Sequence, residues 1–361
     1  MARTLYVTSL SVALAAMAVA TGTTTSPADA ATKYCDGPAV TWKISLFGKR
    51  RAVTEGVEAI SKYAKDQTCG KFDYKIYYGE QLSKAKENLD GINVGALEGG
   101  FICASYHPGK VRALGVLDLP FLPVYDYDTA IKVYDTLWAR KELVDSLGRW
   151  KARRHLQNIL PRYEYMGRGT APKTLEDFKG KRLRALGGMG DAAKAIGAVP
   201  TTMPAPETYT ALQRGTVDAV GFPFSYTFAA YKLDEISSWY TTNMSAGMVN
   251  CFTAISQPAW EKLPKQYQAI LDEALPGAYK AMVDAYDAED KINLPKWEKS
   301  GKLTAVTFSE EELAKFQKIG GKPVWEKWVE ETKPEVPTAQ ALLDLVLKTA
   351  NDLNKSKAAK K

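Results

Sequence analysis

The sequence predicts an α/β fold of two similar lobes, and three observations support this prediction. Between residues 39 and 104, strand-like segments alternate with amphipathic helical segments, which favours a largely parallel sheet. A helix that ends at glycine and leads into a short strand with an acidic residue occurs twice, in residues 87–101 and 210–222. From about Ser256 onwards the pattern is helical.

The first lobe begins with five alternating elements. The strands are rich in β-branched and aromatic residues, and the second helix is stopped by a glycine. In chain order we expect a strand over 39–47, a helix over 52–66, a strand over 73–79, a helix over 81–95 and a strand over 96–104.

The C-terminal part is expected to consist of long helices. Ser256 is a candidate cap for the first of them, and helical periodicity continues through residues 277–301. Ser309 and Glu312 have the spacing of a capping box before another helix. The predicted division of the chain is a leader (1–30), a first lobe (31–158, with later segments returning to it), a second lobe (159–255) and a helical region across both lobes (256–361).

The first 30 residues resemble an export signal. Arg3 precedes a short apolar run over residues 10–20, and the small-x-small triplet that ends at Ala30 is typical of a signal-peptidase site. The run is too short for a membrane anchor. We therefore expect cleavage near Ala30, a periplasmic protein and no membrane insertion afterwards. The net charge of +7 is spread along the chain, which does not indicate nucleic-acid binding.

Four cysteines follow the leader: Cys35, Cys69, Cys103 and Cys251. In an exported protein this even number permits two disulfides, in any of three pairings. We expect a Cys35–Cys69 bridge because these residues bracket the first strand and helix. Cys103 and Cys251 lie in apolar runs, so buried free thiols are the alternative for them.

No local pattern indicates catalysis or metal binding. The two histidines, His107 and His155, have no catalytic motif around them, and neither a G-x-S-x-G nor an H-E-x-x-H sequence is present. We expect His155 to lie on the surface and His107 in a loop after a strand. The prediction is that the protein has no catalytic residue, no metal site and no cofactor.

The stretch from Lys181 to Ala198 permits two interpretations. Residues 188–193 fit the dinucleotide fingerprint G-x-G-x-x-A, but an exported protein seldom meets nicotinamide cofactors. Arg184 instead stands at the carboxyl end of a predicted buried strand, where α/β proteins bind ligands. Its guanidinium could grip a carboxylate ligand in a bidentate manner, or form a structural ion pair with an acid of the protein.

Several segments resemble one family, the solute receptors of tripartite ATP-independent periplasmic (TRAP) transporters of DctP type. The central one is "LEDFKGKRLRALGGMGDAAKAIGAVPTTMPAPETYTALQRGTVDAVGFP", over residues 175–223. Residues 77–100, 117–123 and 257–271 are similar to other parts of the family's sequence, so the resemblance covers most of the chain from Trp42 to Lys280.

The resemblance implies a two-lobed periplasmic-binding-protein-like fold with a hinge and a long helix spanning both lobes. It further implies a receptor that closes on an organic acid and delivers it to a TRAP membrane permease. Arg184 matches the family's carboxylate-binding arginine, and Arg168 matches a second, less universal one. Glu207 and Tyr209 match a helix after the turn, where packing and capping are their expected roles.

The sequence departs from the family where the ligand is held. Phe222 replaces a commonly found asparagine, Ala205 replaces a residue that is often aromatic, and Tyr106 and Cys103 replace charged residues. With Phe224 and Tyr226 they predict a pocket with few partners for hydroxyl groups, and hence an acid whose remainder is apolar, for example aromatic. The alternative is that residues 221–231 are hinge or core.

Two other functional classes remain open on the sequence alone. The first is an exported hydrolase or oxidoreductase on the same scaffold, for which the sequence displays no site. The second is a receptor for a solute without a carboxylate, such as an amine, which would need acidic residues in the cleft.

Overall fold

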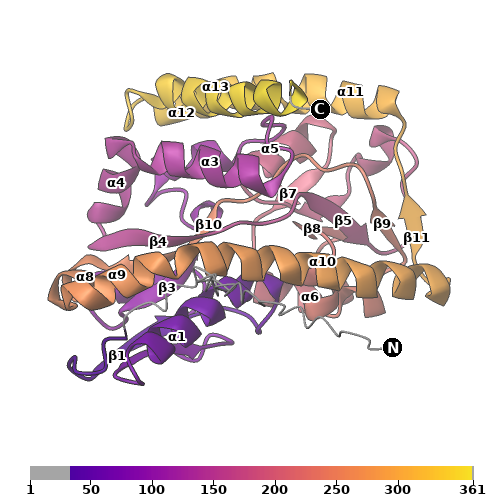
Figure 1. Ribbon diagram of the computed structural model, residues 1–361. Helices are drawn as coiled ribbons and strands as arrows, with labels where there is room; N and C mark the ends of the chain where they lie inside the picture. Colours follow the sequence, from indigo (N-terminus) through magenta and orange to yellow (C-terminus); the bar gives the residue numbers. More distant parts are fainter. Residues whose placement is uncertain (1–32, 360–361) are drawn as a thin grey trace, which may run out of the picture. The chain divides into compact units, whose positions relative to one another are not determined.

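The structure is a computed structural model that describes residues 33–359, so the expected leader and its cleavage site near Ala30 lie outside the described residues. Two mixed sheets form the framework (Figure 1). We call the part built on the five-stranded sheet the first lobe and the part built on the six-stranded sheet the second lobe. The two-lobed α/β fold predicted from the sequence is confirmed.

The first lobe opens with parallel strands that are connected by helices. Its strands, from edge to edge, are β2 (Phe72–Tyr77), β1 (Val40–Ser45), β3 (Gly99–Cys103), β10 (Cys251–Ser256) and β4 (Ala152–Asn158). Its helices are α1 (Glu55–Gln67), α2 (Asn88–Asn93), α3 (Tyr127–Trp138) and α4 (Lys141–Gly148), with 3₁₀ turns η1 (Ala52–Thr54), η2 (Ala104–Tyr106) and η3 (Arg112–Asp118). Helix α2 is shorter than the predicted 81–95 because the Glu80 carboxylate accepts the Ala85 N–H and holds that stretch in a turn.

The second lobe has shorter strands. They lie in the order β11 (Thr304–Val306), β9 (Trp239–Thr241), β5 (Tyr163–Gly167), β8 (Ala219–Pro223), β6 (Arg182–Arg184) and β7 (Val199–Thr201). Its helical segments are η4 (Leu175–Phe178), α5 (Gly187–Ala195), η5 (Ala205–Glu207), α6 (Thr208–Gln213), α7 (Tyr226–Ala230) and η6 (Leu233–Glu235).

The chain crosses between the lobes three times: between β4 and β5, between β9 and β10, and along α10 (Leu275–Ser300) into β11. Strand β10 pairs with β3 and β4 of the first sheet. The predicted second lobe (159–255) includes most of this strand, whereas the structure assigns the strand to the first lobe. A short apolar strand does not show by itself which sheet it joins, because the pairing is long-range.

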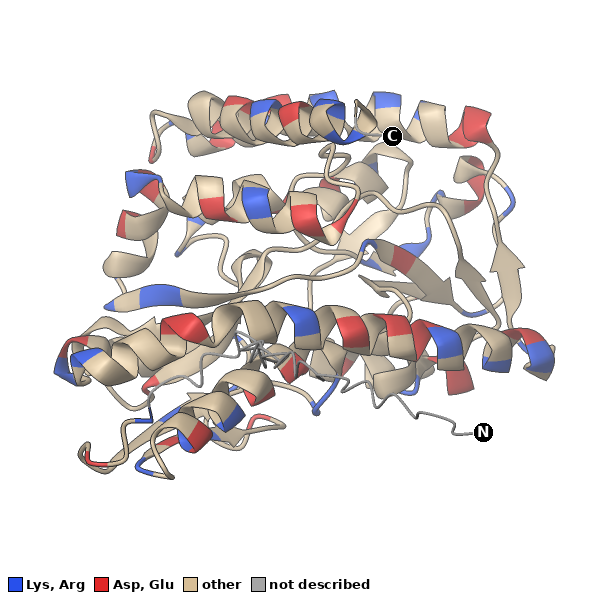
Figure 2. Ribbon diagram, in the orientation of Figure 1, with Lys and Arg blue, Asp and Glu red and all other residues tan. Residues whose placement is uncertain are grey.

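Helix α10 follows α8 (Gln257–Lys262) and α9 (Lys265–Glu273) and spans both lobes, as predicted. It contacts α1 and β4 of the first lobe and α7 of the second. Its surface carries both signs of charge interspersed, as Figure 2 shows. In the described part of the chain, no helix is long and apolar enough to cross a bilayer.

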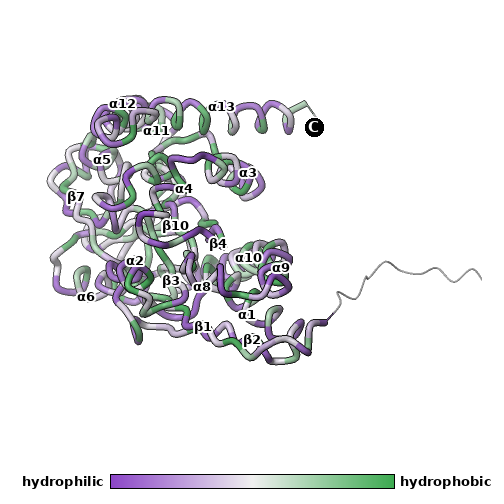
Figure 3. The backbone as a smooth tube through the Cα atoms, turned by 90° about the vertical axis from the view of Figure 1, so that its left-hand side faces the viewer, coloured by the Kyte–Doolittle hydropathy of each residue, from purple (hydrophilic) through white to green (hydrophobic). Residues whose placement is uncertain are grey.

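The last three helices, α11 (Glu310–Gly320), α12 (Lys322–Thr332) and α13 (Ala339–Ala358), form a layer over α3 and α5. Hydrophobic and hydrophilic residues alternate along α13 (Figure 3), whose buried face carries Leu342 and Val346. Ser309 caps α11 as predicted, but the Glu312 carboxylate accepts the Leu175 N–H of the second lobe, so the capping box is only half formed.

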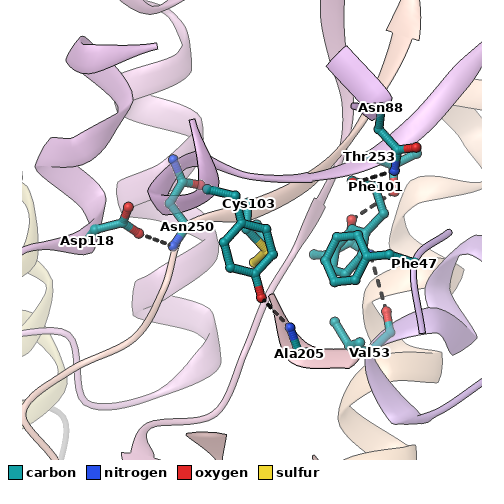
Figure 4. Close-up of a disulfide and its surroundings, with 12 residues drawn as sticks. Phe47, Val53, Asn88, Phe101, Cys103, Asp118, Ala205, Asn250 and Thr253 are labelled. Atoms are coloured by element: carbon teal, nitrogen blue, oxygen red, sulfur yellow. Dashed lines mark hydrogen bonds between the residues drawn. A yellow bond between two sulfur atoms is a disulfide. The ribbon is translucent and has the colours of Figure 1, made fainter. Parts of the chain in front are cut away.

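Two disulfides connect elements of the first lobe. Cys35 is bonded to Cys69, as predicted, and Cys103 is bonded to Cys251. The second bridge joins residues that face each other on β3 and β10 (Figure 4), so the free-thiol alternative for this pair is wrong.

Candidate functional site

Arg184 is fully buried at the end of β6. Its Nε donates to Met203 O (3.2 Å), its Nη1 to Gly221 O (2.6 Å) and its Nη2 to Tyr106 Oη (3.1 Å). All three acceptors are neutral, and Arg184 has no ion pair with any acid of residues 33–359. The structural ion pair considered as an alternative is therefore absent from the described part of the chain, and two of the five guanidinium N–H groups are left over.

Tyr106 connects this arginine to the first lobe. It lies in η2, directly after β3, and its hydroxyl oxygen accepts hydrogen bonds from Arg184 Nη2 and from the Ala205 N–H, both at 3.1 Å. The Ala205 bond is drawn in Figure 4. Since Ala205 and Arg184 belong to the second lobe, one side chain links the two lobes at the arginine.

A cavity opens beside Tyr106 between the two lobes. The space in it that the centre of a water molecule can reach is only about 30 Å³, so an organic solute enters only if the walls move apart. Its walls are mostly aromatic and aliphatic, and both lobes contribute to them. The lining residues are Phe47, Arg51, Val53, Phe101, Cys103, Tyr106, Leu160, Tyr163, Ala205, Phe222, Pro223, Tyr226, Thr227, Tyr231 and Cys251.

Phe222 forms the wall on the second-lobe side. The Arg184 guanidinium lies over its ring at 4.1 Å, and the ring of Tyr231 stacks against it with 5.9 Å between centroids. This geometry holds the guanidinium between an apolar ring and neutral hydrogen-bond acceptors. The charge of Arg184 is thus oriented but not neutralised.

Arg51 is a buried arginine in the cavity wall that was not predicted from the sequence. It directly precedes η1, and its side chain lines the cavity with 9% of its surface exposed. The signal was available: "KRR" at residues 49–51 follows the carboxyl end of the first strand, where ligands bind in α/β folds. Arg51 was not predicted because a run of basic residues usually lies on a solvated surface.

Arg184 does not line the cavity itself but contacts the wall residues Tyr106 and Phe222. Two other predicted site residues lie away from the cavity. Arg168 is exposed, and its Nη1 donates to the carbonyls of Leu212 and Gln213 at the end of α6. It follows Gly167, which pairs with Ala219 at the start of β8, whereas the cavity lies at the other end of that strand. Arg168 matches the family's second arginine in sequence, but it lies at the opposite end of β8 from the cavity.

Phe224 also lies away from the cavity. It packs against Tyr240 and Trp297 and belongs to the core of the second lobe. Because β8 ends at Pro223, the alternation that places Phe222 in the cavity wall does not continue to Phe224. Cys103, Tyr106 and Tyr226 do line the cavity together with Phe222.

The glycine-rich turn has a packing role. Gly187 has a φ of +50°, and a β-carbon there would lie 2.9 Å from Cβ of Asp118. At Gly188 a β-carbon would lie 2.7 Å from Cδ of Pro120. Glycine at both positions lets the start of α5 approach the Asp118–Pro120 segment of the first lobe.

Both histidines are buried, and neither lines the cavity. Burial lowers the pKa of each to about 4. The expected surface position of His155 is wrong: its Nε2 lies 3.2 Å from Leu271 O in the core of the first lobe. Among residues 33–359, no group of three or more His, Cys, Asp and Glu side chains is arranged to hold a metal ion.

Two buried carboxyl groups hold the crossing between β9 and β10. Asp118 accepts the Asn250 N–H at 2.5 Å, and Glu164 accepts the N–H groups of Met244 and Ser245, both at 3.1 Å. Burial raises the pKa of Asp118 to about 8 and that of Glu164 to about 7.

Comparison with known proteins gives a consistent result. Residues 46–332 match the family model described as bacterial extracellular solute-binding protein, family 7 (DctP). A solute-binding protein of Albidiferax ferrireducens is 27% identical over 267 residues, which are 72% of this chain and 76% of that protein. The C4-dicarboxylate-binding periplasmic protein DctP of Rhodobacter capsulatus is 29% identical over 224 residues, 61% of this chain and 66% of the relative.

Among solved structures, a TRAP periplasmic solute-binding protein of Desulfovibrio salexigens with bound orotic acid is similar in fold. Its TM-score is 0.77 at 21% sequence identity, and the alignment covers 86% of this chain and 99% of that one.

Proposed function

Because the chain belongs to the DctP family of bacterial extracellular solute-binding proteins, we propose that it captures an organic acid between its lobes and delivers it to a TRAP-type membrane permease. The members of this family are solute-binding proteins of transporters rather than enzymes. The acid as the solute, Arg184 as the residue that binds it and the periplasm as the place of action are parts of the proposal.

The buried and unpaired charge of Arg184 carries the proposal. A guanidinium that is fully withdrawn from water and surrounded by neutral acceptors is costly unless an anion joins it. A carboxylate can take up the two unused N–H groups and neutralise the charge in a region of low dielectric constant. This favours an acid over an amine, which would add a second positive charge to the cavity.

The rest of the cavity favours an acid with an apolar body. Most of its walls are apolar, and the rings of Phe47, Phe101 and Phe222 and the Cys103–Cys251 disulfide offer a ligand hydroxyl no strong partner. The hydroxyl groups of Thr227 and Tyr231, which are unpaired among residues 33–359, are polar exceptions. Flat aromatic ligands suit such walls because they stack against rings. The relative from Desulfovibrio salexigens, with its bound orotic acid, is an example of a flat carboxylate held on this fold.

Binding is coupled to closure of the two lobes. The space of about 30 Å³ that the centre of a water molecule can reach requires an open form for entry, and the Tyr106–Arg184 hydrogen bond holds the lobes together at the site. A bound acid that contacts both walls shifts the population towards the closed form, which is the form offered to the permease.

A thermal-shift screen with a library of organic acids and amines tests the proposal. Stoichiometric stabilisation by carboxylates without turnover is the expected result. Stabilisation by amines alone would favour a cationic solute, and conversion of an acid would favour the exported enzyme. Sequencing the N-terminus of the exported protein tests whether the leader is cleaved near Ala30.

A further inference from the structure

We propose that the solute is a dianion, an aromatic dicarboxylate, and that Arg51 forms a second anion subsite in the same cavity. This inference rests on the proposed function, since it takes Arg184 as the site of the first carboxylate. It adds a residue in the first lobe and narrows the solute from an acid to a diacid with a flat spacer.

Arg51 has an unsatisfied guanidinium. Its Nη1 donates to the carbonyls of Phe47 (3.2 Å) and Lys49 (2.8 Å), while its Nε and Nη2 form no hydrogen bond with residues 33–359. It also forms no ion pair with an acid of the described chain. The adjacent Arg50 shows the contrast, because it is exposed and forms a bidentate ion pair with Glu55 at 2.8 Å.

Aromatic rings surround the Arg51 guanidinium on several sides. Its central carbon lies 5.7 Å from the ring centroids of Phe47, Phe101 and Tyr231. These rings stabilise a cation through their π faces and exclude water, but they do not supply a counter-charge. The arrangement keeps Arg51 charged and ready for an anion.

Tyr231 adds a hydroxyl donor at the same place. Its Oη is buried and has no hydrogen-bond partner in the described chain. A β-carbon at Gly48 would lie 2.0 Å from this oxygen and 3.1 Å from Arg51 Nη1, so the glycine leaves room for the hydroxyl beside the guanidinium. A carboxylate at Arg51 would accept a hydrogen bond from this hydroxyl group.

The two arginines contact the same pair of stacked rings. Arg51 lies beside Tyr231, Tyr231 stacks on Phe222, and Arg184 lies over Phe222. Arg51 therefore lines the cavity directly, whereas Arg184 contacts Tyr106 and Phe222, two residues of the cavity wall. A solute with two carboxylates on an aromatic ring neutralises both charges at once, whereas a monoacid leaves one of them unpaired.

Calorimetric titration of the mature protein with benzoate and with the three benzenedicarboxylate isomers tests the inference. We expect the best diacid to bind at least about 30-fold more tightly than benzoate. Arg51→Gln should remove this preference, so that diacid and benzoate bind within about threefold of each other. Tyr231→Phe should reduce the preference by about fivefold.

Two further variants separate a binding role from a structural one. Arg50→Gln, the matched control, should leave both affinities within about twofold of the wild type. Arg51→Lys keeps the positive charge but not the planar set of guanidinium donors. It should therefore retain part of the diacid preference, which would show that a variant at this position still folds.

The outcomes distinguish this inference from the proposed function. If wild-type protein binds benzoate as tightly as every diacid, if no benzenedicarboxylate binds, or if Arg51→Gln weakens benzoate and diacid equally, the second subsite is refuted. If no acid of the library binds, or if Arg184→Met leaves acid binding intact, the proposed function itself fails.

Discussion

Each lobe contributes a pair of nearby arginines, and in each pair one arginine faces water while the other is buried. In the first lobe these are Arg50 and Arg51, and in the second lobe Arg182 and Arg184. The exposed member is paired with a carboxylate of the protein, and the buried member has only neutral partners. Residues of identical chemistry thus have opposite roles, and burial without a counter-charge is what distinguishes a candidate ligand contact from a surface residue.

The lobes differ in how they are held together. Both disulfides lie in the first lobe, and the second bridge is part of the cavity wall. The described part of the second lobe contains no disulfide and depends on packing around rings such as Trp239 and Phe178. The first lobe is therefore the more strongly cross-linked of the two.

The largest effect is expected from removal of the Cys103–Cys251 bridge. The double variant Cys103→Ala/Cys251→Ala should lower the free energy of unfolding by about 4 kcal/mol or more, because the bridge closes a loop with a sequence separation of 148. Removing the Cys35–Cys69 bridge, with a separation of 34, should cost about 1 kcal/mol less. Urea titrations followed by circular dichroism measure both, and an equal or reversed order would contradict the loop-length argument.

The next effect concerns the buried and exposed arginines of the second lobe. Arg184→Met should weaken binding of the best acid by about 100-fold or more, since it removes the buried partner of the carboxylate. Arg182→Met, two residues away, should change the affinity by less than about twofold because its guanidinium already pairs with Asp218 on the surface. Calorimetry on both variants measures the difference, and comparable losses would show that position in the strand does not matter.

The sequence predicted the buried arginine of the second lobe but not that of the first lobe. Arg184 could be predicted because a charged residue near the carboxyl end of a buried strand needs a reason. Arg51 escaped because it stands in a loop with two other basic residues, where only the tertiary packing of Phe47 and Tyr231 distinguishes it from its neighbours.

The fold was predicted in its alternation of elements and in its long helix, because those depend on local periodicity. Contacts between distant residues determine which sheet β10 joins. They also determine that Glu312 accepts the Leu175 N–H, so local patterns revealed neither feature. The same holds for Phe224: its position depends on where β8 ends, and the aromatic run "GFPFSYTF" does not mark that residue.

A smaller effect is expected from pH, through the buried acids that hold the β9–β10 crossing, one from each lobe. Since the pKa of Asp118 is raised to about 8, the folded protein holds a proton that the unfolded chain releases near pH 4. Stability from this group is therefore present at low pH and lost as pH rises to 8. The pKa of Glu164, raised to about 7, acts in the same direction up to that pH.

The buried histidines oppose this trend at lower pH. Their lowered pKa of about 4 destabilises the folded state as pH falls below 6.5, so the acid and histidine effects should nearly cancel between pH 4 and 6.5. Between pH 6.5 and 8 the free energy of unfolding should fall by about 2 kcal/mol on account of Asp118. Urea titrations at several pH values measure this, and Asp118→Asn should flatten the upper part of the curve. A curve that rises towards pH 8 would refute the assignment.

The smallest effect is expected at the exposed arginine of the first lobe. Arg50 and Glu55 are 59% and 27% exposed, so water already solvates both charges. A double-mutant cycle of Arg50→Gln and Glu55→Gln should give a coupling energy below about 1 kcal/mol. This coupling should fall further in about 0.5 M salt, whereas the pairing of a carboxylate with buried Arg184 should be screened much less. A coupling that is large and insensitive to salt would mean that exposure does not separate the two kinds of arginine, and the contrast between them would lose its physical basis.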